Sequence, residues 1–282
     1  EGEGVEFYHL DVTSNGMLRQ SYFIRFISTA LMACAASLAL GQFYDGSNME
    51  FGKNRVQHRT FEWQYLPTSR AEVYYYQGGK AYANRITSEI KEWIEDVEGL
   101  YDRNFDGTVQ VLVYNKQAEF RQSNIGSGQL NGQNIGGTAT LVGSKLFVYA
   151  DGMWEHTEED IKRSLSSLLF NQILYGGNWQ EALRSSTTGI SFPDWFTAGL
   201  HSYVAQPWSA EAALHVWDAA RTGDIIHAHR STGEEARWVG HGVWKYIADV
   251  FGEAVIANAL YMVRVSSNLE KGLQYATGMD LA

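Results

Sequence analysis

The sequence of 282 residues has few cysteines and few prolines: one cysteine, Cys34, and three prolines, Pro67, Pro193 and Pro207. A single thiol cannot form an intramolecular disulfide, and it cannot supply the thiolate set of a structural zinc site. The prolines stand far apart, and no Ser/Gly/Pro-rich stretch divides the chain. These scarcities exclude a disulfide-stapled scaffold and favour one continuous domain.

Positively charged residues are also scarce: the chain has 22 lysines and arginines against 32 acidic residues. Charged residues make up 19% of the chain, the formal net charge is −10, and no run of lysine or arginine occurs. Proteins that bind nucleic acid or anionic membrane surfaces concentrate positive charge on one face. The sequence therefore predicts neither partner. With 45% hydrophobic residues, the composition is that of an ordinary globular protein.

The histidine–glutamate signature of zinc peptidases is missing. In an HExxH motif, one helix face presents two imidazoles to zinc, and the glutamate is the general base for the metal-bound water. None of the eight histidines is followed by glutamate, and no histidine lies between His156 and His201. The first helix of such a site is expected at residues 161–174, which have a helical apolar stripe instead. That stripe consists of Ile161, Leu165, Leu168, Leu169 and Ile173.

Two other catalytic signatures are absent as well. Ser164, Ser166 and Ser167 are not framed by a Gly-x-Ser-x-Gly elbow, and a polar helix face accounts for them. The glycine-rich loop at 126–137 lacks the Lys-Ser/Thr ending of a phosphate-binding loop. No cofactor or metal is therefore expected.

The N-terminal region has the pattern of an export signal. Residues 17–41 contain a positive start with Arg19 and Arg25, an apolar stretch, and a small-x-small cleavage site at 39–41. We predict a signal peptide at 17–41, with residues 1–16 as upstream sequence outside the native mature protein and no transmembrane segment in the mature chain. A lipoprotein box ending at Cys34 is the alternative. Either reading predicts export to the periplasm, the outer membrane or the cell surface.

Hydrophobic periodicity predicts strands first and helices afterwards. Strands are expected at 62–68, 71–77, 109–114, 138–142 and 145–150, and helices at 80–101, 116–123, 158–175, 194–205, 209–221, 240–251, 253–264 and 268–276. This order predicts an α+β fold for residues 42–282: a mixed sheet with flanking helices, followed by a helical subdomain.

Six segments of the sequence carry a resemblance to a known family. They read FEWQYL at 61–66, VYYYQGGKAYA at 73–83, VLVYNKQAEFRQSN at 111–124, FNQILYGGNW at 170–179, PDWFTAGLHSY at 193–203 and HGVWKYIADVFG at 241–252. Together they resemble the peptidase MA-like (gluzincin-fold) domain at the N-terminus of secreted proteins that often continue into a TolB-like β-propeller. The resemblance implies a zincin-like fold over 42–282, truncated before such a propeller.

The same resemblance implies that the peptidase chemistry has been lost. Catalytic relatives have Pro-x-Trp-hydrophobic-x-Glu-Gly-x-x-x-Tyr, in which the glutamate is the third zinc ligand. Here Pro193, Trp195, Gly199 and Tyr203 keep the frame, and Ala198 takes the place of the glutamate. The remnant of the cleft is expected at Ser164, Ser167, Leu168, Ala198, His201 and Tyr203. The resemblance thus implies a pseudo-peptidase.

A domain that has lost peptidase activity can still bind peptides. In gluzincin-like folds an edge strand aligns extended peptide by backbone hydrogen bonds. Residues Thr138, Ala139, Thr140, Leu141 and Val142 are the expected strand. The resulting hypothesis is an exported, non-catalytic domain that binds a peptide or protein of the cell envelope.

Two alternatives stay open on sequence grounds. One is a zinc metallohydrolase whose ligands come from His201, His227, His229, His241 or the acidic residues. The other is a carbohydrate-binding module that uses exposed aromatic side chains, with Trp179, Trp208 and Trp238 as candidates.

Overall fold

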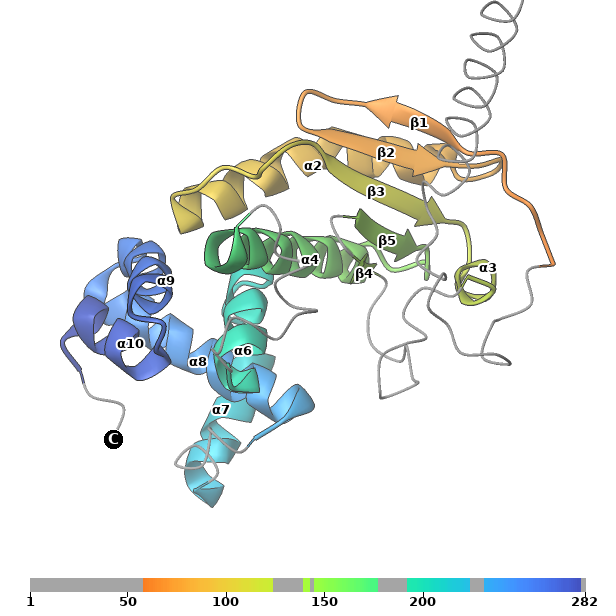
Figure 1. Ribbon diagram of the computed structural model, residues 1–282. Helices are drawn as coiled ribbons and strands as arrows, with labels where there is room; N and C mark the ends of the chain where they lie inside the picture. Colours follow the sequence, from red (N-terminus) through yellow and green to blue (C-terminus); the bar gives the residue numbers. More distant parts are fainter. Residues whose placement is uncertain (1–57, 124–138, 143–144, 177–191, 224–230, 280–282) are drawn as a thin grey trace, which may run out of the picture. The chain divides into compact units, whose positions relative to one another are not determined.

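A five-stranded mixed sheet with the strand order β1-β2-β3-β5-β4 occupies the first half of the described chain (Figure 1). The computed structural model describes residues 58–123, 139–142, 145–176, 192–223 and 231–279. All of them belong to one compact unit, Met49–Ala282. The strands are β1 (Gln64–Pro67), β2 (Ala71–Tyr75), β3 (Val109–Tyr114), β4 (Ala139–Val142) and β5 (Lys145–Tyr149).

The middle of the sheet is parallel and both of its edges are antiparallel. β2, β3 and β5 run in one direction, with Val73 opposite Val111 and Val111 opposite Leu146. β1 pairs antiparallel with β2, and β4 pairs antiparallel with β5. Two parallel neighbours need a long crossover between them. Helix α2 (Lys80–Tyr101) supplies it between β2 and β3, with the bounds that the sequence predicted.

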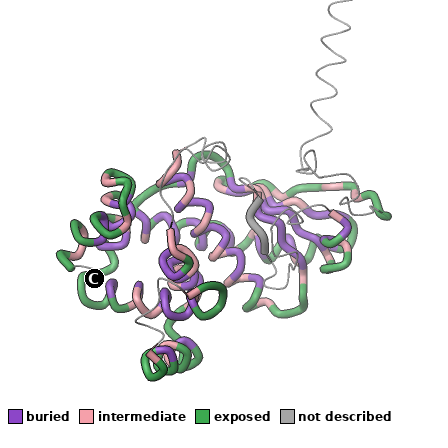
Figure 2. The backbone as a smooth tube through the Cα atoms, turned by 60° about the horizontal axis from the view of Figure 1, so that its bottom comes forward, coloured by how far each residue is buried: buried purple, intermediate pink, exposed green. Residues whose placement is uncertain are grey.

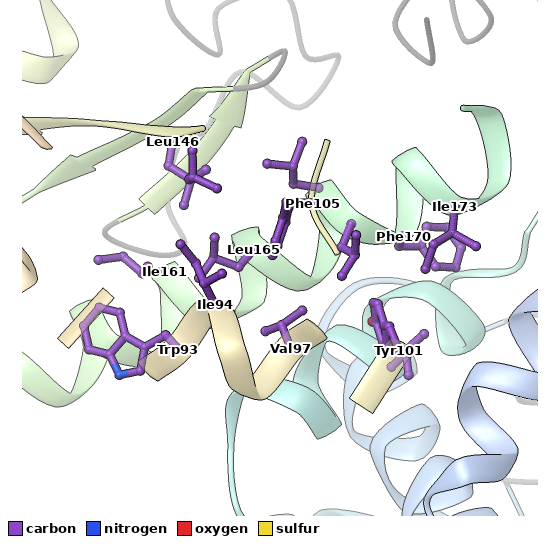
Figure 3. Close-up of a cluster of buried hydrophobic side chains, with 14 of the residues drawn as sticks. Trp93, Ile94, Val97, Tyr101, Phe105, Leu146, Ile161, Leu165, Phe170 and Ile173 are labelled. Carbon is purple, nitrogen blue, oxygen red and sulfur yellow. The ribbon is translucent and has the colours of Figure 1, made fainter. Parts of the chain in front are cut away.

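The main core fills the space between the sheet and the helices α2 and α4 (Trp154–Tyr175) (Figure 3). Alternate residues of β2, β3 and β5 point to this side, and α2 contributes a stripe at spacings of three and four. Each fully buried aliphatic or aromatic side chain contributes about 1.5–3 kcal/mol. Figure 2 shows the buried residues running through the sheet and into the helices behind it.

The opposite face of the sheet carries a smaller, aromatic cluster. Tyr114 lies at its centre, with ring centroids 5.8 Å from Phe61, 5.3 Å from Trp63 and 5.4 Å from Phe120. Phe120 belongs to the short helix α3 (Gln117–Arg121). Tyr76 donates its hydroxyl to Glu119 at 2.6 Å, which ties α3 to the end of β2. The chain before β1 is thereby fixed against the sheet.

The second half of the described chain is helical. Its elements are α6 (Asp194–Ala205), α7 (Ala210–Thr222), α8 (Gly233–Phe251), α9 (Ala254–Ser266) and α10 (Leu269–Thr277). α6 packs against both α4 and α8, and α10 packs on α9. The predicted α+β class, a mixed sheet with flanking helices followed by a helical part, is confirmed.

Two helices begin earlier than the sequence predicted. α4 begins at Trp154 rather than at residue 158, and α8 begins at Gly233 rather than at 240. Gly240 stands inside α8 because the helix α6 passes so close that a Cβ there would overlap the carbonyl oxygen of Trp195. The glycine is a packing requirement and not a helix end.

No single helix in the part of the chain that the structure describes is long and apolar enough to cross a membrane. α8 and α9 meet that length and composition only as a pair, and the pair is bent by 111°.

Candidate functional site

The expected cleft residues lie along two helices that contact each other, α4 and α6. On α4, Ser164 and Leu168 are buried and Ser167 is half-buried. On α6, Ala198 is half-buried and precedes Gly199, whose Cα faces the backbone of Gly240 on α8. At these positions the helices present two hydroxyls, an isobutyl group and a methyl group, none of which is a strong metal ligand.

A buried chain of three polar side chains links α2, α4 and α6. The Tyr101 hydroxyl lies 2.6 Å from Ser166 Oγ, and Ser166 Oγ lies 2.7 Å from His201 Nδ1. Burial, with the positive charge of Arg163 nearby, lowers the pKa of His201 to about 3. Burial also raises the pKa of Tyr101. The chain is therefore neutral at physiological pH, and it satisfies polar groups that would be costly to bury alone.

A second serine–histidine pair links α6 to α8. Ser202 Oγ lies 3.0 Å from His241 Nδ1, and His241 is only 1% exposed. Burial lowers the pKa of His241 to about 4, with smaller contributions from Arg237 and Lys245. The Nε2 atom of His241 has no hydrogen-bond partner among the described residues.

Neither pair has the access that covalent catalysis needs. Ser166 and Ser202 are fully buried, so no substrate carbonyl can approach their hydroxyls. Among the described residues, no group of three or more histidine, cysteine or acidic side chains is arranged to hold a metal ion. His227 and His229 lie outside the described residues. The two serine–histidine pairs join helices, and they are not placed for chemistry on a ligand.

An open groove lies beside these helices, between α2, the end of α6, α8 and the start of α9. Its volume is about 1120 Å³. Its charged lining residues are Glu95, Asp96, Asp102, Asp249, Glu253, Lys162 and Lys245. Five carboxylates thus face two ammonium groups. Tyr203 and Trp208 also line the groove and give it an aromatic wall.

The aromatic wall stands next to His241. The Tyr203 and Trp208 ring centroids lie 5.9 Å and 5.5 Å from that of His241. The Tyr203 hydroxyl donates a hydrogen bond to Glu253 at 3.4 Å. Burial, and to a smaller extent the negative charge of Glu253, raises the pKa of Tyr203 to about 12. Tyr203, which the resemblance assigned to the remnant cleft, therefore also belongs to the wall of the groove.

The expected peptide-aligning strand is the edge strand β4. Its backbone pairs with β5 from Ala139 opposite Val148 to Val142 opposite Lys145. Among the described strands it has no neighbour on its other side, and it packs beside α4. Thr138, the first residue of the predicted strand, lies outside the described residues.

The aromatic residues that motivated the carbohydrate hypothesis differ in their exposure. Trp238 was expected to be exposed, and this is wrong: it is 7% exposed, and it stacks on His215 with ring centroids 5.0 Å apart. Trp208 is 40% exposed, and Trp179 lies outside the described residues.

Sequence reasoning missed the roles of Ser166, Ser202 and His241. Ser166 forms a hydrogen bond with a histidine 35 positions away, and Ser202 with one 39 positions away. Neither pair can therefore be predicted from a local sequence motif. The one available signal is a small polar residue on the apolar face of a core helix, which must find a partner there. The acidic groove was missed for the same reason, because five separate helices contribute to it: α2, α4, α6, α8 and α9.

Comparison with known proteins adds no identification. A scan against protein-family models found no match, and a search of the curated proteins found none either.

Proposed function

We propose that this chain is an exported, non-catalytic pseudo-peptidase domain with a zincin-like fold, which binds a peptide or protein of the cell envelope. The observation that carries the proposal is the pairing of α4 with α6. Along these helices the frame of the resemblance is kept by Pro193, Trp195 and Gly199. The positions for zinc ligands and for the general base hold serine, leucine and alanine instead.

The binding element of this proposal is β4. Its outer edge faces no other described strand. In this proposal the N–H and C=O groups of that edge pair with an extended peptide. Pairing of this kind depends on the backbone and tolerates many side chains. The helix α4 packs beside this strand.

The alternative of a zinc hydrolase has less support. His201 and His241 each use Nδ1 in a bond to a buried serine, and both are almost fully buried. The two other histidines, His227 and His229, amount to two ligands. A catalytic zinc site uses three protein ligands, so it would need an acidic side chain as the third.

The test uses proline at successive positions of β4 in the full chain. One of the two variants Thr140→Pro and Leu141→Pro removes a donor to β5, and the other removes a donor at the free edge. We expect the edge variant to keep the thermal stability of the parent and to lose capture of fluorescein-labelled ten-residue peptides, measured by anisotropy.

The same protein samples report on catalysis. After exposure to zinc and buffer exchange, we expect no stoichiometric zinc by inductively coupled plasma mass spectrometry, and no cleavage of the peptides. Unchanged peptide capture by both proline variants would refute binding at β4. One tightly held zinc per chain together with peptide cleavage would refute the loss of catalysis.

A further inference from the structure

The acidic groove holds negative charge that its own lysines do not neutralise. Lys162 bonds Glu158 at 2.8 Å, and Lys245 bonds Asp249 at 2.5 Å, so both ammonium groups are already paired. Asp96 and Asp102 line the groove, are exposed, and take part in none of the ion pairs found among the described residues. Two carboxylates therefore face the hollow without a cation.

The aromatic wall adds a second attraction for a cation. Trp208 is 40% exposed at the groove, and Tyr203 stands beside it. The face of an aromatic ring attracts ammonium and guanidinium groups. His241 lies behind these two rings and stays uncharged at neutral pH, so the wall contributes no positive charge against such a ligand.

The size of the groove favours a segment of chain over a small molecule. Pockets for small ligands enclose roughly 300–1,000 Å³ and are lined mostly by apolar groups. This groove is larger, at about 1120 Å³, and its lining is rich in charged side chains. It also runs over several helices, from Asp96 on α2 to Glu253 at the start of α9.

We propose that the acidic groove binds a basic peptide segment of a partner protein. The segment carries at least two lysine or arginine side chains, which pair with Asp96 and Asp102, and the Trp208 ring packs against one of their stems. This inference rests on neither β4 nor the loss of catalysis. It names a second surface and the chemistry of the partner that fits it.

The experiment measures binding of a fluorescein-labelled Gly-Lys-Ala-Lys-Ala-Lys-Gly peptide to the full chain by anisotropy at low ionic strength. The matching glutamate peptide is the ligand control. The variant Asp96→Asn/Asp102→Asn removes both free carboxylates, and asparagine tolerates the left-handed backbone at 102 (φ 48°). We expect it to weaken binding by about tenfold, since exposed charge pairs contribute up to about 1 kcal/mol each.

Glu62→Gln/Glu92→Gln is the matched control variant, because it removes two exposed carboxylates that do not line the groove. We expect this control to bind like the parent, and Trp208→Ala to bind several-fold more weakly. Equal weakening by both double variants would reduce the effect to overall charge and overturn the proposal. The absence of binding by the parent protein would overturn it too. Retained lysine-peptide binding in the β4 proline variants would separate this surface from the edge strand.

Discussion

Gly199 and Gly240 mark a place where two helices leave no room for a methyl group. A Cβ on Gly199 would meet the backbone of Gly240, and a Cβ on Gly240 would meet Trp195 O. Nearby, the Trp244 indole donates to the carbonyl oxygen of Phe196 at 2.9 Å, a bond that needs the same close approach of α8 to α6. The two glycines therefore set the distance between α6 and α8 at which the Ser202–His241 pair can form.

At the residue scale, we predict that Gly240→Ala destabilises the protein by about 2 kcal/mol, because overpacking against backbone exceeds the gain in helix propensity. The melting temperature should fall by several degrees in a calorimetric scan. Gly99→Ala is the control, since a Cβ there meets nothing within 4 Å. That variant should be neutral or slightly stabilising. An unchanged melting temperature for Gly240→Ala would contradict the close contact.

Single residues were the least predictable level of this structure. The sequence predicted the start of a helix at Gly240. Its actual role depends on α6, which lies some forty positions earlier in the chain. The interpretation of Trp238 as an exposed aromatic failed in the same way, because its partner His215 comes from another helix.

At the scale of elements, Glu98 joins three segments that are separate in the sequence. Its side chain is 8% exposed, forms an ion pair with Arg70 before β2, and accepts a hydrogen bond from the Phe105 backbone at 2.7 Å. Because Glu98 is on α2, Arg70 precedes β2 and Phe105 is in the turn before β3, one carboxylate ties the starts of both strands to the helix.

We predict that Glu98→Ala lowers the free energy of unfolding by about 2–4 kcal/mol, since it leaves a buried N–H and a partly buried guanidinium without their acceptor. Glu98→Gln should cost less, because the amide oxygen can still accept from Phe105. Urea unfolding of both variants, with the exposed Glu92→Ala as control, checks this. Equal stability of Glu98→Ala and Glu92→Ala would show that the carboxylate does not join these segments.

Helices and strands whose apolar residues recur at a regular spacing were predictable from the sequence. α2 and β3 occupy the predicted ranges 80–101 and 109–114 because their apolar spacing is uninterrupted. The first residues of α4 and α8 were not predicted. In α4 they are mostly polar, and in α8 the apolar residues Ala236, Trp238 and Val239 stand before Gly240, where the prediction began the helix. The candidate site combines faces of several elements, so even a correct list of elements would not have located it.

At the scale of the whole molecule, the buried histidines couple stability to pH. The pKa values of His201 and His241 in the folded state, about 3 and about 4, lie below the value of about 6.5 for an unfolded chain. The unfolded chain therefore binds protons first as the pH falls. The stabilisation by neutral histidine is complete above about pH 6.5 and is lost as the pH falls from there toward 4 and 3.

We predict that the free energy of unfolding falls between pH 7.5 and pH 5.5, with a slope approaching about 1.4 kcal/mol per pH unit for each buried histidine at the lower end. Urea titrations at these pH values measure the slope, and His241→Gln should reduce it. A pH-independent stability in this window would mean that both imidazoles bind protons in the folded protein as readily as in the unfolded chain, which contradicts the lowered pKa values.

The two serine–histidine pairs also have a consequence for how the sequence can change during evolution. His201 and Ser202 are neighbours on α6, and each is bound to a different helix by the same chemistry. A descendant chain that loses the serine at 166 no longer gains from histidine at 201, and the same holds for 202 and 241. In diverged copies of this protein, each pair is expected to change together. Covariation of positions 166 and 201, and of positions 202 and 241, would then show from sequences alone that α6 contacts both α4 and α8.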